Sequence, residues 1–402
     1  MLHPDRGLDV VDAATRADRH WACHHRAMAY RTGEAIADAV VVGGGIVGVA
    51  AAAQLATTGR RVVLVERTGI AAGASGRNSG VVQHPFDPVL VDLHLETLTL
   101  YRSLDDFSFP AAPVGLLLVT RDVDGAERLT AALQASHPQL RPSFIAPEVM
   151  KSLEPAIAPG VAACRLDIGY PVAPAAATSA LAGRARSLGV EIRLGAGASV
   201  WRDGDLAAGV ELDSGDRIAA ADVVIAAGPW TPSIVDPGNA WRPIGANWGV
   251  VVPVDLGDAP RHVLEEAEIS IEPGADTDGM RSAFSLVTAD GVSSLGSTFL
   301  DDEPLPDTLV PVLIERGATF VPSIAKADVG PPRLCARPLS FDGRPLVGRV
   351  PGIDGLWVAA GHGPWGISTG PASGRLVAEL VDGRVAAPSP ELDPARFAAP
   401  PN

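Results

Sequence analysis

Cysteine is scarce in this chain of 402 residues. There are only three cysteines, Cys23, Cys164 and Cys335, and they lie far apart. An odd number of widely spaced cysteines argues against a disulfide framework, so the sequence predicts a protein of the reducing cytoplasm. The stretch 1–20 is polar and lacks the apolar core of a signal peptide. Two histidines follow Cys23, but no second ligand pair at a fixed spacing accompanies them, so we predict no metal site.

Positive charge and long apolar runs are also in short supply. The chain carries 32 Lys and Arg against 47 Asp and Glu, a formal net charge of −15. This balance argues against binding to nucleic acid or to an anionic membrane surface, because both select clusters of basic side chains. No uninterrupted apolar stretch reaches the roughly 18 residues of a membrane-spanning helix. Hydrophobic residues still make up 47% of the chain, which is enough for a sizeable core.

Glycine and proline, in contrast, are abundant. The 43 Gly and 35 Pro predict many turns and short elements rather than a helical bundle, and the length predicts two domains. The clearest pattern begins with a buried strand at 39–42 that ends in three glycines. An Ala-rich helix at 46–57 and a second strand at 61–66 follow. A β-α-β unit of this kind implies a parallel sheet.

Pieces of the same α/β pattern recur much further along the chain. They are a helix at 173–188 with a strand at 191–194, a strand at 221–228, and a strand at 356–360 before a last helix at 368–381. Between them, 241–335 loses this pattern and shows alternating strands such as WGVVVPV, EISIEP and AFSLV.

These pieces predict an α/β fold (α+β overall). A Rossmann-like nucleotide-binding domain is built from discontinuous segments, and it is interleaved with a mostly antiparallel β-sheet substrate domain flanked by helices. The predicted boundaries are an N-terminal extension (1–37), nucleotide-binding segments (38–85, 147–240 and 336–385), substrate-domain segments (86–146 and 241–335) and a C-terminal tail (386–402).

A glycine fingerprint lies between the first strand and the first helix. Gly43, Gly45 and Gly48 form G-x-G-x-x-G, which allows a tight turn, a close approach to a pyrophosphate and packing of the helix on the strand. The helix N-terminus offers free N–H groups and a positive dipole end to phosphates. Glu66 ends the second strand, where a carboxylate accepts ribose hydroxyls and repels a 2′-phosphate. The sequence therefore predicts an adenine dinucleotide other than NADP, and it leaves FAD and NAD open.

Further motifs carry a family resemblance. They are GASGRNSG at 73–80, LEP at 153–155, AAGPW at 226–230, DGRPLVG at 342–348 and GHGPWGISTGPASGR at 361–375. Together and in this order, they make the chain from about residue 38 to 383 resemble the D-amino acid oxidase (DAO) superfamily of FAD-dependent oxidoreductases. That superfamily includes glycine oxidase, sarcosine oxidase and D-amino acid dehydrogenases. The resemblance implies that the dinucleotide is FAD.

The resemblance also implies which residues contact FAD. The loop 73–80 would pass between the pyrophosphate and the isoalloxazine, and the backbone of Val200 would meet the adenine. The turn 366–368 would point backbone N–H groups at the flavin, where negative charge develops on reduction. The full set of expected FAD-binding residues is Gly43, Gly45, Ile46, Val47, Gly48, Glu66, Arg67, Ala74, Ser75, Asn78, Ser79, Gly80, Val81, Val200, Ala227, Gly228, Trp230, Gly361, Gly366, Ile367 and Ser368.

On the substrate side, Arg337 resembles the family's carboxylate-binding arginine, and its guanidinium fork suits a carboxylate. His84 is a candidate to face the flavin or the substrate, because a neutral imidazole can accept a proton. Some amino acid oxidases have a second basic residue where this chain has Pro364, beside Trp365. That difference favours a bulkier, less polar or secondary amine. Candidates for an apolar substrate wall are Trp365, Trp248, Tyr170 and Phe86.

Cys335 lies close to the place where sarcosine oxidases join a cysteine covalently to the flavin. A buried cysteine also serves as a small hydrophobic side chain. Non-covalent FAD is the main expectation, and a covalent link through Cys335 is the alternative.

The resemblance predicts FAD-dependent oxidation of the C–N bond of an amino acid or amine by hydride transfer, giving an imine and then a carbonyl compound. An oxidase that reduces molecular oxygen to hydrogen peroxide is favoured over a dehydrogenase. SGRNSG at 75–80 also resembles 2-hydroxyglutarate-oxidising relatives, so a 2-hydroxy acid dehydrogenase that reduces a quinone or carrier is one alternative. A flavin-binding subunit of a heteromeric dehydrogenase is another. The expected partners are the substrate and the electron acceptor, and an oligomer is compatible with the sequence.

Overall fold

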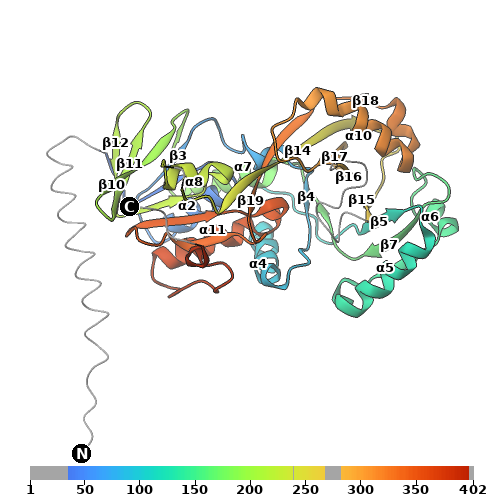
Figure 1. The fold of residues 1–402 in the computed structure, drawn as a ribbon, viewed down its shortest axis with the longest axis horizontal. Helices are drawn as coiled ribbons and strands as arrows, with labels where there is room; N and C mark the ends of the chain where they lie inside the picture. The colour runs from blue at the N-terminus through green and yellow to red at the C-terminus, as the bar shows by residue number, and fades with distance from the viewer. Residues whose placement is uncertain (1–34, 239, 268–281, 398–402) are drawn as a thin grey trace, which may run out of the picture.

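The computed structural model describes residues 35–238, 240–267 and 282–397. They form two lobes, one containing the blue and red segments and the other containing the cyan-green and orange ones (Figure 1). The candidate ligands Cys23, His24 and His25, the predicted strand at 268–273 and most of the predicted N-terminal extension lie outside the described residues. In the described part of the chain, no helix is both long enough and apolar enough to span a membrane.

A six-stranded sheet forms the centre of the first lobe. Its strand order is β20-β21-β13-β2-β3-β9, and every neighbouring pair is parallel except β20 and β21. Alternate side chains of a strand point to opposite faces, so Val41 packs toward the helices while Val40 and Val42 pack toward another sheet. The strands are β2 (Ala39–Val42), β3 (Val62–Glu66), β9 (Glu191–Leu194), β13 (Asp222–Ile225), β20 (Leu346–Arg349) and β21 (Leu356–Ala360).

Two layers cover this sheet. On one face lie α2 (Ile46–Ala56), α7 (Ala176–Ser187) and α11 (Gly366–Val381), and α4 (Val91–Arg102) packs on α11. The red α11 lies beside the blue α2, so segments from the two ends of the described chain pack together (Figure 1). On the other face lies a four-stranded sheet of order β1-β12-β11-β10. Its strands are β1 (Ala35–Ile36), β10 (Ala198–Asp203), β11 (Leu206–Leu212) and β12 (Arg217–Ala219).

A nine-stranded sheet organises the second lobe. Its order is β18-β14-β17-β16-β15-β5-β7-β6, β19 also pairs with β14, and only β15 and β5 run parallel. The helices α5 (Val123–Ser136), α6 (Pro147–Leu153) and α10 (Pro306–Phe320) flank it. The strands are β5 (Leu116–Thr120), β6 (Ser143–Ile145), β7 (Ala162–Leu166), β14 (Ile244–Asp255), β15 (Val263–Glu266), β16 (Ser282–Ala289), β17 (Val292–Thr298), β18 (Asp328–Val329) and β19 (Arg333–Ser340).

The sheet pairings differ from the predicted domain boundaries in two places. The nucleotide-binding segment 147–240 was predicted to start before β7, yet β7 pairs with β5 and β6 in the nine-stranded sheet. Strand β19 crosses the predicted boundary at 336 as a single element paired with β14. A strand joins a sheet through its partners, and the partners of a short strand are not visible in its own sequence. The helix α10 was also not predicted.

Smaller elements connect the two lobes. A two-stranded sheet joins β4 (Val81–Val82) to β8 (Tyr170–Pro171), and α3 (Ala74–Arg77) contacts β19. Strand β14 begins in the core of the first lobe with Ile244 and continues in the core of the second with Val250 to Val254. A single strand, β14, therefore belongs to the cores of both lobes, in addition to the contacts where the lobes meet.

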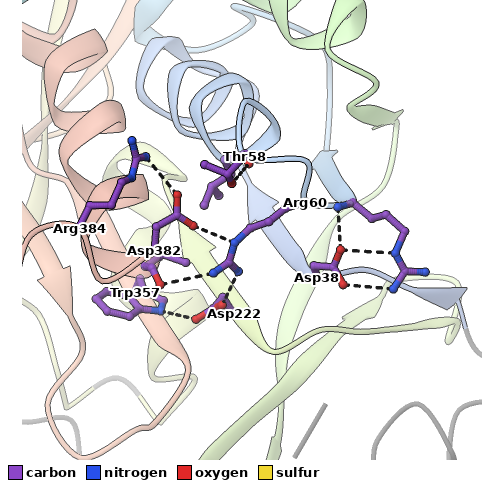
Figure 2. A network of polar contacts seen from close by, with 10 residues as sticks. Asp38, Thr58, Arg60, Asp222, Trp357, Asp382 and Arg384 are labelled. Carbon is purple, nitrogen blue, oxygen red and sulfur yellow. Dashed lines mark hydrogen bonds and ion pairs between the residues drawn. The ribbon is translucent and has the colours of Figure 1, made fainter. Parts of the chain in front are cut away.

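An ionic network fixes the amino-end edge of the six-stranded sheet (Figure 2). Arg60, between α2 and β3, pairs with Asp222 of β13 and with Asp382 after α11, both at 2.8 Å. Trp357 of β21 donates its indole N–H to the second oxygen of Asp222 at 3.0 Å. The network thus joins four segments that lie far apart in the sequence, at the edge of the sheet opposite Gly43 and Glu66.

Candidate active site

A cavity of about 520 Å³ opens where the carboxyl ends of β2, β3, β13 and β21 meet. Ligands of doubly wound sheets bind at this edge, beside the point where the strand order reverses, and here β3 and β13 flank β2. Strands β14 and β19 of the second lobe complete the wall. The lining contains these predicted residues: Gly43, Gly45, Ile46, Val47, Glu66, Arg67, Ala74, Ser75, Asn78, Ala227, Gly228, Trp230, Gly366, Ile367 and Arg337.

The turn from β2 into α2 is built for close contact. Gly43 has φ 119°, and a Cβ there would lie 2.4 Å from the carbonyl oxygen of Ala226. The first helical N–H group, that of Ile46, donates to the Oγ of Ser75 at 2.9 Å. Gly45, before it, has no side chain with which to cap the helix. The end of α2 therefore presents N–H groups and a positive dipole end to the cavity, a combination that binds phosphate.

Glu66 occupies the end of β3 beside this turn. One carboxylate oxygen accepts from the N–H of Gly44 at 2.7 Å, and the other accepts from the N–H of Thr68 at 2.7 Å. These bonds hold the carboxylate at the cavity wall without a cationic partner among the described residues. Arg67 follows it, and its guanidinium lies 5.3 Å from the centre of the Trp230 ring. A carboxylate fixed in this way is suited to ribose hydroxyls.

The loop 73–80 is held by Asn78. Its amide donates to the carbonyl oxygens of Ala74 and Ser75, and its Oδ1 accepts from the N–H of Gly80. Asn78 therefore shapes the loop in addition to lining the cavity. Arg77 at the end of α3 also lines the cavity, and its guanidinium donates to the carbonyl of Leu334 at 3.4 Å.

Arg337 enters the cavity wall from β19 and is surrounded by neutral acceptors. Nη1 donates to the carbonyl of Thr298 at 2.9 Å, and Nη2 donates to the Oγ of Ser297. The guanidinium lies 4.7 Å from the centre of the Phe299 ring. Burial lowers the pKa of Arg337 from its usual value, but an arginine stays charged in proteins. Among the described residues no carboxylate pairs with it, so this cation is available to an anionic ligand.

Gly249 makes room for this guanidinium. It pairs with Cys335 across the β14–β19 register, and a Cβ at Gly249 would lie 2.4 Å from both Nη atoms of Arg337. The absence of a side chain at Gly249 thus allows the guanidinium of Arg337 to lie at this position in the cavity wall.

Cys335 also lines the cavity, on the same face of β19 as Arg333 and Arg337. Burial raises the pKa of its thiol, and the charges of Arg337, Arg77 and Arg333 only partly oppose that effect. The thiol is therefore protonated at neutral pH.

His362 belongs to the lining although the sequence analysis did not select it as a site residue. Its side chain is buried, and Nε2 has no hydrogen-bond partner among the described residues. Burial lowers the pKa of His362 to about 4, so the ring is neutral at physiological pH. A buried ring nitrogen without a partner carries a free-energy cost that a polar ligand in the cavity would relieve.

Other predicted residues lie outside the lining. His84 is buried against His94, with ring centres 5.4 Å apart, and Trp365 packs with Val89, Leu90 and Leu93. Neither faces the cavity. The sequence could not reveal this, because a loop residue's direction depends on its neighbours in the fold. The remaining predicted residues outside the lining are Gly48, Ser79, Gly80, Val81, Val200, Gly361 and Ser368.

The lining residues that the sequence analysis did not select include three with ionisable side chains: Arg77, Glu303 and His362. Arg77 and His362 lie inside the motifs GASGRNSG and GHGPWG, so the motifs themselves could have identified them. Glu303 follows β17 in an acidic stretch that gives no such signal. Trp248 of β14 lines the cavity as predicted, whereas Tyr170 stacks on Phe109.

A dinucleotide-binding α/β fold with a cavity at its strand-order reversal defines the class of this protein. A family model described as FAD dependent oxidoreductase (DAO) matches residues 38–380. The chain therefore belongs to the DAO family of FAD-dependent oxidoreductases, which confirms the predicted family, and FAD is the cofactor of that family.

Known relatives agree with this assignment. The chain is 30% identical over 379 residues to a glycine oxidase of Pseudomonas aeruginosa, covering 89% of this chain and 97% of the relative. It is 30% identical over 234 residues to a D-amino acid dehydrogenase of Cereibacter sphaeroides, covering 56% of this chain and 50% of the relative. The solved glycine oxidase of Geobacillus kaustophilus has a TM-score of 0.76 at 23% identity, covering 91% of this chain and 100% of that one. This likeness confirms the predicted fold class.

The cavity fits FAD chemically. The N-terminus of α2 offers donors to a pyrophosphate, and Glu66 offers a fixed carboxylate to a ribose. His362 offers a neutral ring whose Nε2 lacks a partner in the described structure. The glycines at 43 and 45 leave the backbone open to close approach, which a Cβ would block.

Proposed function

We propose that this protein oxidises the C–N bond of an amino acid, or of an amine that bears a carboxylate, with FAD as the electron acceptor. The observation that carries the proposal is Arg337, a cation in the cavity wall that no described carboxylate neutralises. The names of its relatives, glycine oxidase and D-amino acid dehydrogenase, support the same class of substrate. The proposed product is an imine, which water converts to a carbonyl compound and a free amine or ammonia.

Residues from both ends of the described chain would hold FAD. The α2 N-terminus with Ser75 would bind the pyrophosphate, and Glu66 would bind the ribose. Backbone N–H groups at 366–367 and the ring of His362 would contact the flavin. When bound, FAD supplies the two-electron oxidation by taking a hydride from the carbon that bears the amine.

Arg337 would bind the substrate carboxylate through charge-assisted hydrogen bonds and so orient the neighbouring carbon. Its neutral contacts at Ser297, Thr298 and Asn247 fix the guanidinium without cancelling its charge. Such pre-positioning lowers the entropic cost of reaching a reactive geometry.

Molecular oxygen is the proposed final acceptor, which makes the protein an oxidase that releases hydrogen peroxide. We further propose that FAD is held without a covalent bond. The thiolate is the nucleophilic form of cysteine, and burial keeps Cys335 protonated. Acid precipitation of the holoprotein should therefore leave all of the flavin in the supernatant, and flavin in the pellet would contradict this.

Replacement of Arg337 tests the proposal. Arg337→Met should weaken binding of a carboxylate substrate by about 2–5 kcal/mol, because it removes the partner of a buried charge. We expect KM to rise far more than kcat falls, while the decarboxylated amine of the same substrate keeps its KM. Steady-state kinetics on the matched pair measures this. Equal KM values for wild type and variant with the carboxylate substrate would remove the assigned role.

A second variant keeps Arg337 in the sequence but displaces its guanidinium. Gly249→Ala would put a methyl group 2.4 Å from both Nη atoms, and a flexible arginine tip yields more easily than backbone. We expect KM to rise about tenfold, on the order of 1.4 kcal/mol, with little change in the melting temperature. Gly245→Ala on the same strand is the control, because nothing lies within 4 Å of its Cβ.

A further inference from the structure

The two lobes contribute different carboxylates to the cavity wall. Glu66 and Asp213 come from the first lobe, at the ends of β3 and β11. Glu303 comes from the second lobe, shortly after β17, and among the described lining residues it is the only carboxylate from that side. Its neighbours in the lining from the same lobe are Trp248 and the β19 stretch 334–338.

Glu303 belongs to the same stretch of chain that holds Arg337. Ser297, Thr298 and Phe299 contact the guanidinium, and Leu300 then exchanges two backbone hydrogen bonds with Trp248, at 2.7 and 2.9 Å. These bonds fix the start of the loop that carries Glu303. Four residues lie between Thr298 and Glu303, so their Cα atoms are at most about 17 Å apart. The anchored segment 297–303 therefore contacts the guanidinium of Arg337 and also carries Glu303, so a cation and a carboxylate line the same cavity.

The carboxylate of Glu303 is not used within the described structure. It makes no hydrogen bond or ion pair with any described residue, and its side chain is exposed at the cavity. Glu66, in contrast, is held by backbone N–H groups of its own turn. The cations in the lining are Arg67, Arg77 and Arg337, and Arg77 lies on the loop 73–80, beside the proposed site of the FAD diphosphate.

The chemistry of the reaction decides what Glu303 can bind. A carboxylate beside the amine to be oxidised would stabilise its ammonium form, which cannot release a hydride from the neighbouring carbon. A cation further along the substrate carries no such penalty. With Arg337 binding the substrate carboxylate, Glu303 is suited to a second, remote positive charge.

We propose that Glu303 makes the enzyme selective for substrates with a second positive charge remote from the oxidised amine, namely basic amino acids. The inference rests on the proposed function and names the substrate class of that same cavity. Trp248, which lines the same cavity and whose backbone pairs with Leu300, would pack against the apolar stem of such a substrate.

Lysine and norleucine test the inference, because norleucine is lysine with a hydrogen in place of the distal ammonium group. Both enantiomers of each are assayed with the holoprotein. We expect wild-type kcat/KM to be about tenfold higher for lysine than for norleucine. Glu303→Gln should reduce the kcat/KM for lysine to the value for norleucine. In this variant the kcat/KM for norleucine should change less than twofold. Raised salt should reduce the preference of the wild type for lysine over norleucine. Asp302→Asn is the matched control, because its exposed carboxylate lies outside the lining and should affect neither substrate.

The outcomes separate the inference from the proposed function. If Glu303→Gln leaves the lysine preference intact, or lowers kcat/KM equally for both substrates, the inference is wrong while amino acid oxidation stands. If wild type turns over norleucine at least as well as lysine, the inference is also wrong. If neither amino acid nor any other amine reduces the flavin, the proposed function fails and the inference fails with it.

Discussion

At the scale of single residues, the described part of this protein contains arginines without carboxylate partners around its cavity and imidazole rings that are buried. Three arginines, Arg77, Arg333 and Arg337, surround Cys335, and none pairs with a carboxylate among the described residues. Arg77 is exposed, but Arg333 and Arg337 are half-buried, and folding alone does not favour this arrangement because charges are usually paired when they are removed from water. An anionic cofactor and an anionic substrate would supply the missing partners.

Acid should destabilise the protein through His94 and His362. Burial lowers the pKa of each to about 4, with the nearby His84 adding to the shift of His94. The unfolded chain binds protons on these rings below its ordinary pKa of about 6.5, whereas the folded protein binds them only near pH 4. Their contribution is therefore complete above about pH 6.5, and it is lost as the pH falls toward 4.

Denaturant unfolding across this range measures the effect. Each ring should add up to about 1.4 kcal/mol per pH unit to the slope of stability against pH. His94→Gln should remove one such increment whatever its effect on stability at pH 7. A slope that is the same in wild type and variant between about pH 6.5 and 4.5 would contradict the assignment.

At the scale of elements, the crossing of α2 and α11 links the cofactor turn to the C-terminal helix. Gly374 of α11 faces α2 so closely that a Cβ there would lie 2.6 Å from the carbonyl oxygen of Val47 and 2.8 Å from the N–H nitrogen of Ala51. The glycines of GHGPWGISTGPASGR thus serve two purposes. Gly366 lines the cavity, while Gly374 lets the two helices pack.

Gly374→Ala should force α11 away from α2. Ala gains about 1 kcal/mol of helix propensity over Gly, but contacts under 3 Å with backbone cost more, typically 1–3 kcal/mol for overpacking. We expect a lower melting temperature together with weaker FAD binding, because α2 carries the phosphate-binding turn. Gly183→Ala in α7 is the control, since nothing lies within 4 Å of that Cβ, and it should be neutral or stabilising. Equal melting temperatures for the two variants would contradict this packing account.

At the scale of the whole molecule, regular local patterns were predictable and long-range pairings were not. The strands at 191–194 and 356–360 have the predicted bounds, because periodicity and flanking turns define them locally. The helix α10 was missed, since Pro306 and Pro311 interrupt its pattern. Pro306 is tolerated at the first turn, and packing on β16 and β17 supports the rest.

The candidate site shows the same division. Gly43 and Glu66 were predictable because their spacing reflects a geometric requirement, whereas Arg337 was predicted from the family resemblance. Glu303 was not, since only the pairing of Leu300 with Trp248 brings it to the cavity. His84 lies outside the lining, because its direction follows from packing against His94 rather than from its motif.

The measurement that tests the central claim most directly is anaerobic reduction of the purified holoprotein. Matched pairs of an α-amino acid and the α-hydroxy acid with the same side chain are added, and the visible absorbance of the flavin is followed. Arg337 would bind the carboxylate of either, so only the bond that is oxidised differs within a pair. We predict that an amino acid bleaches the flavin and that its hydroxy analogue does not. Bleaching by the hydroxy acid alone would contradict the account and favour a 2-hydroxy acid dehydrogenase.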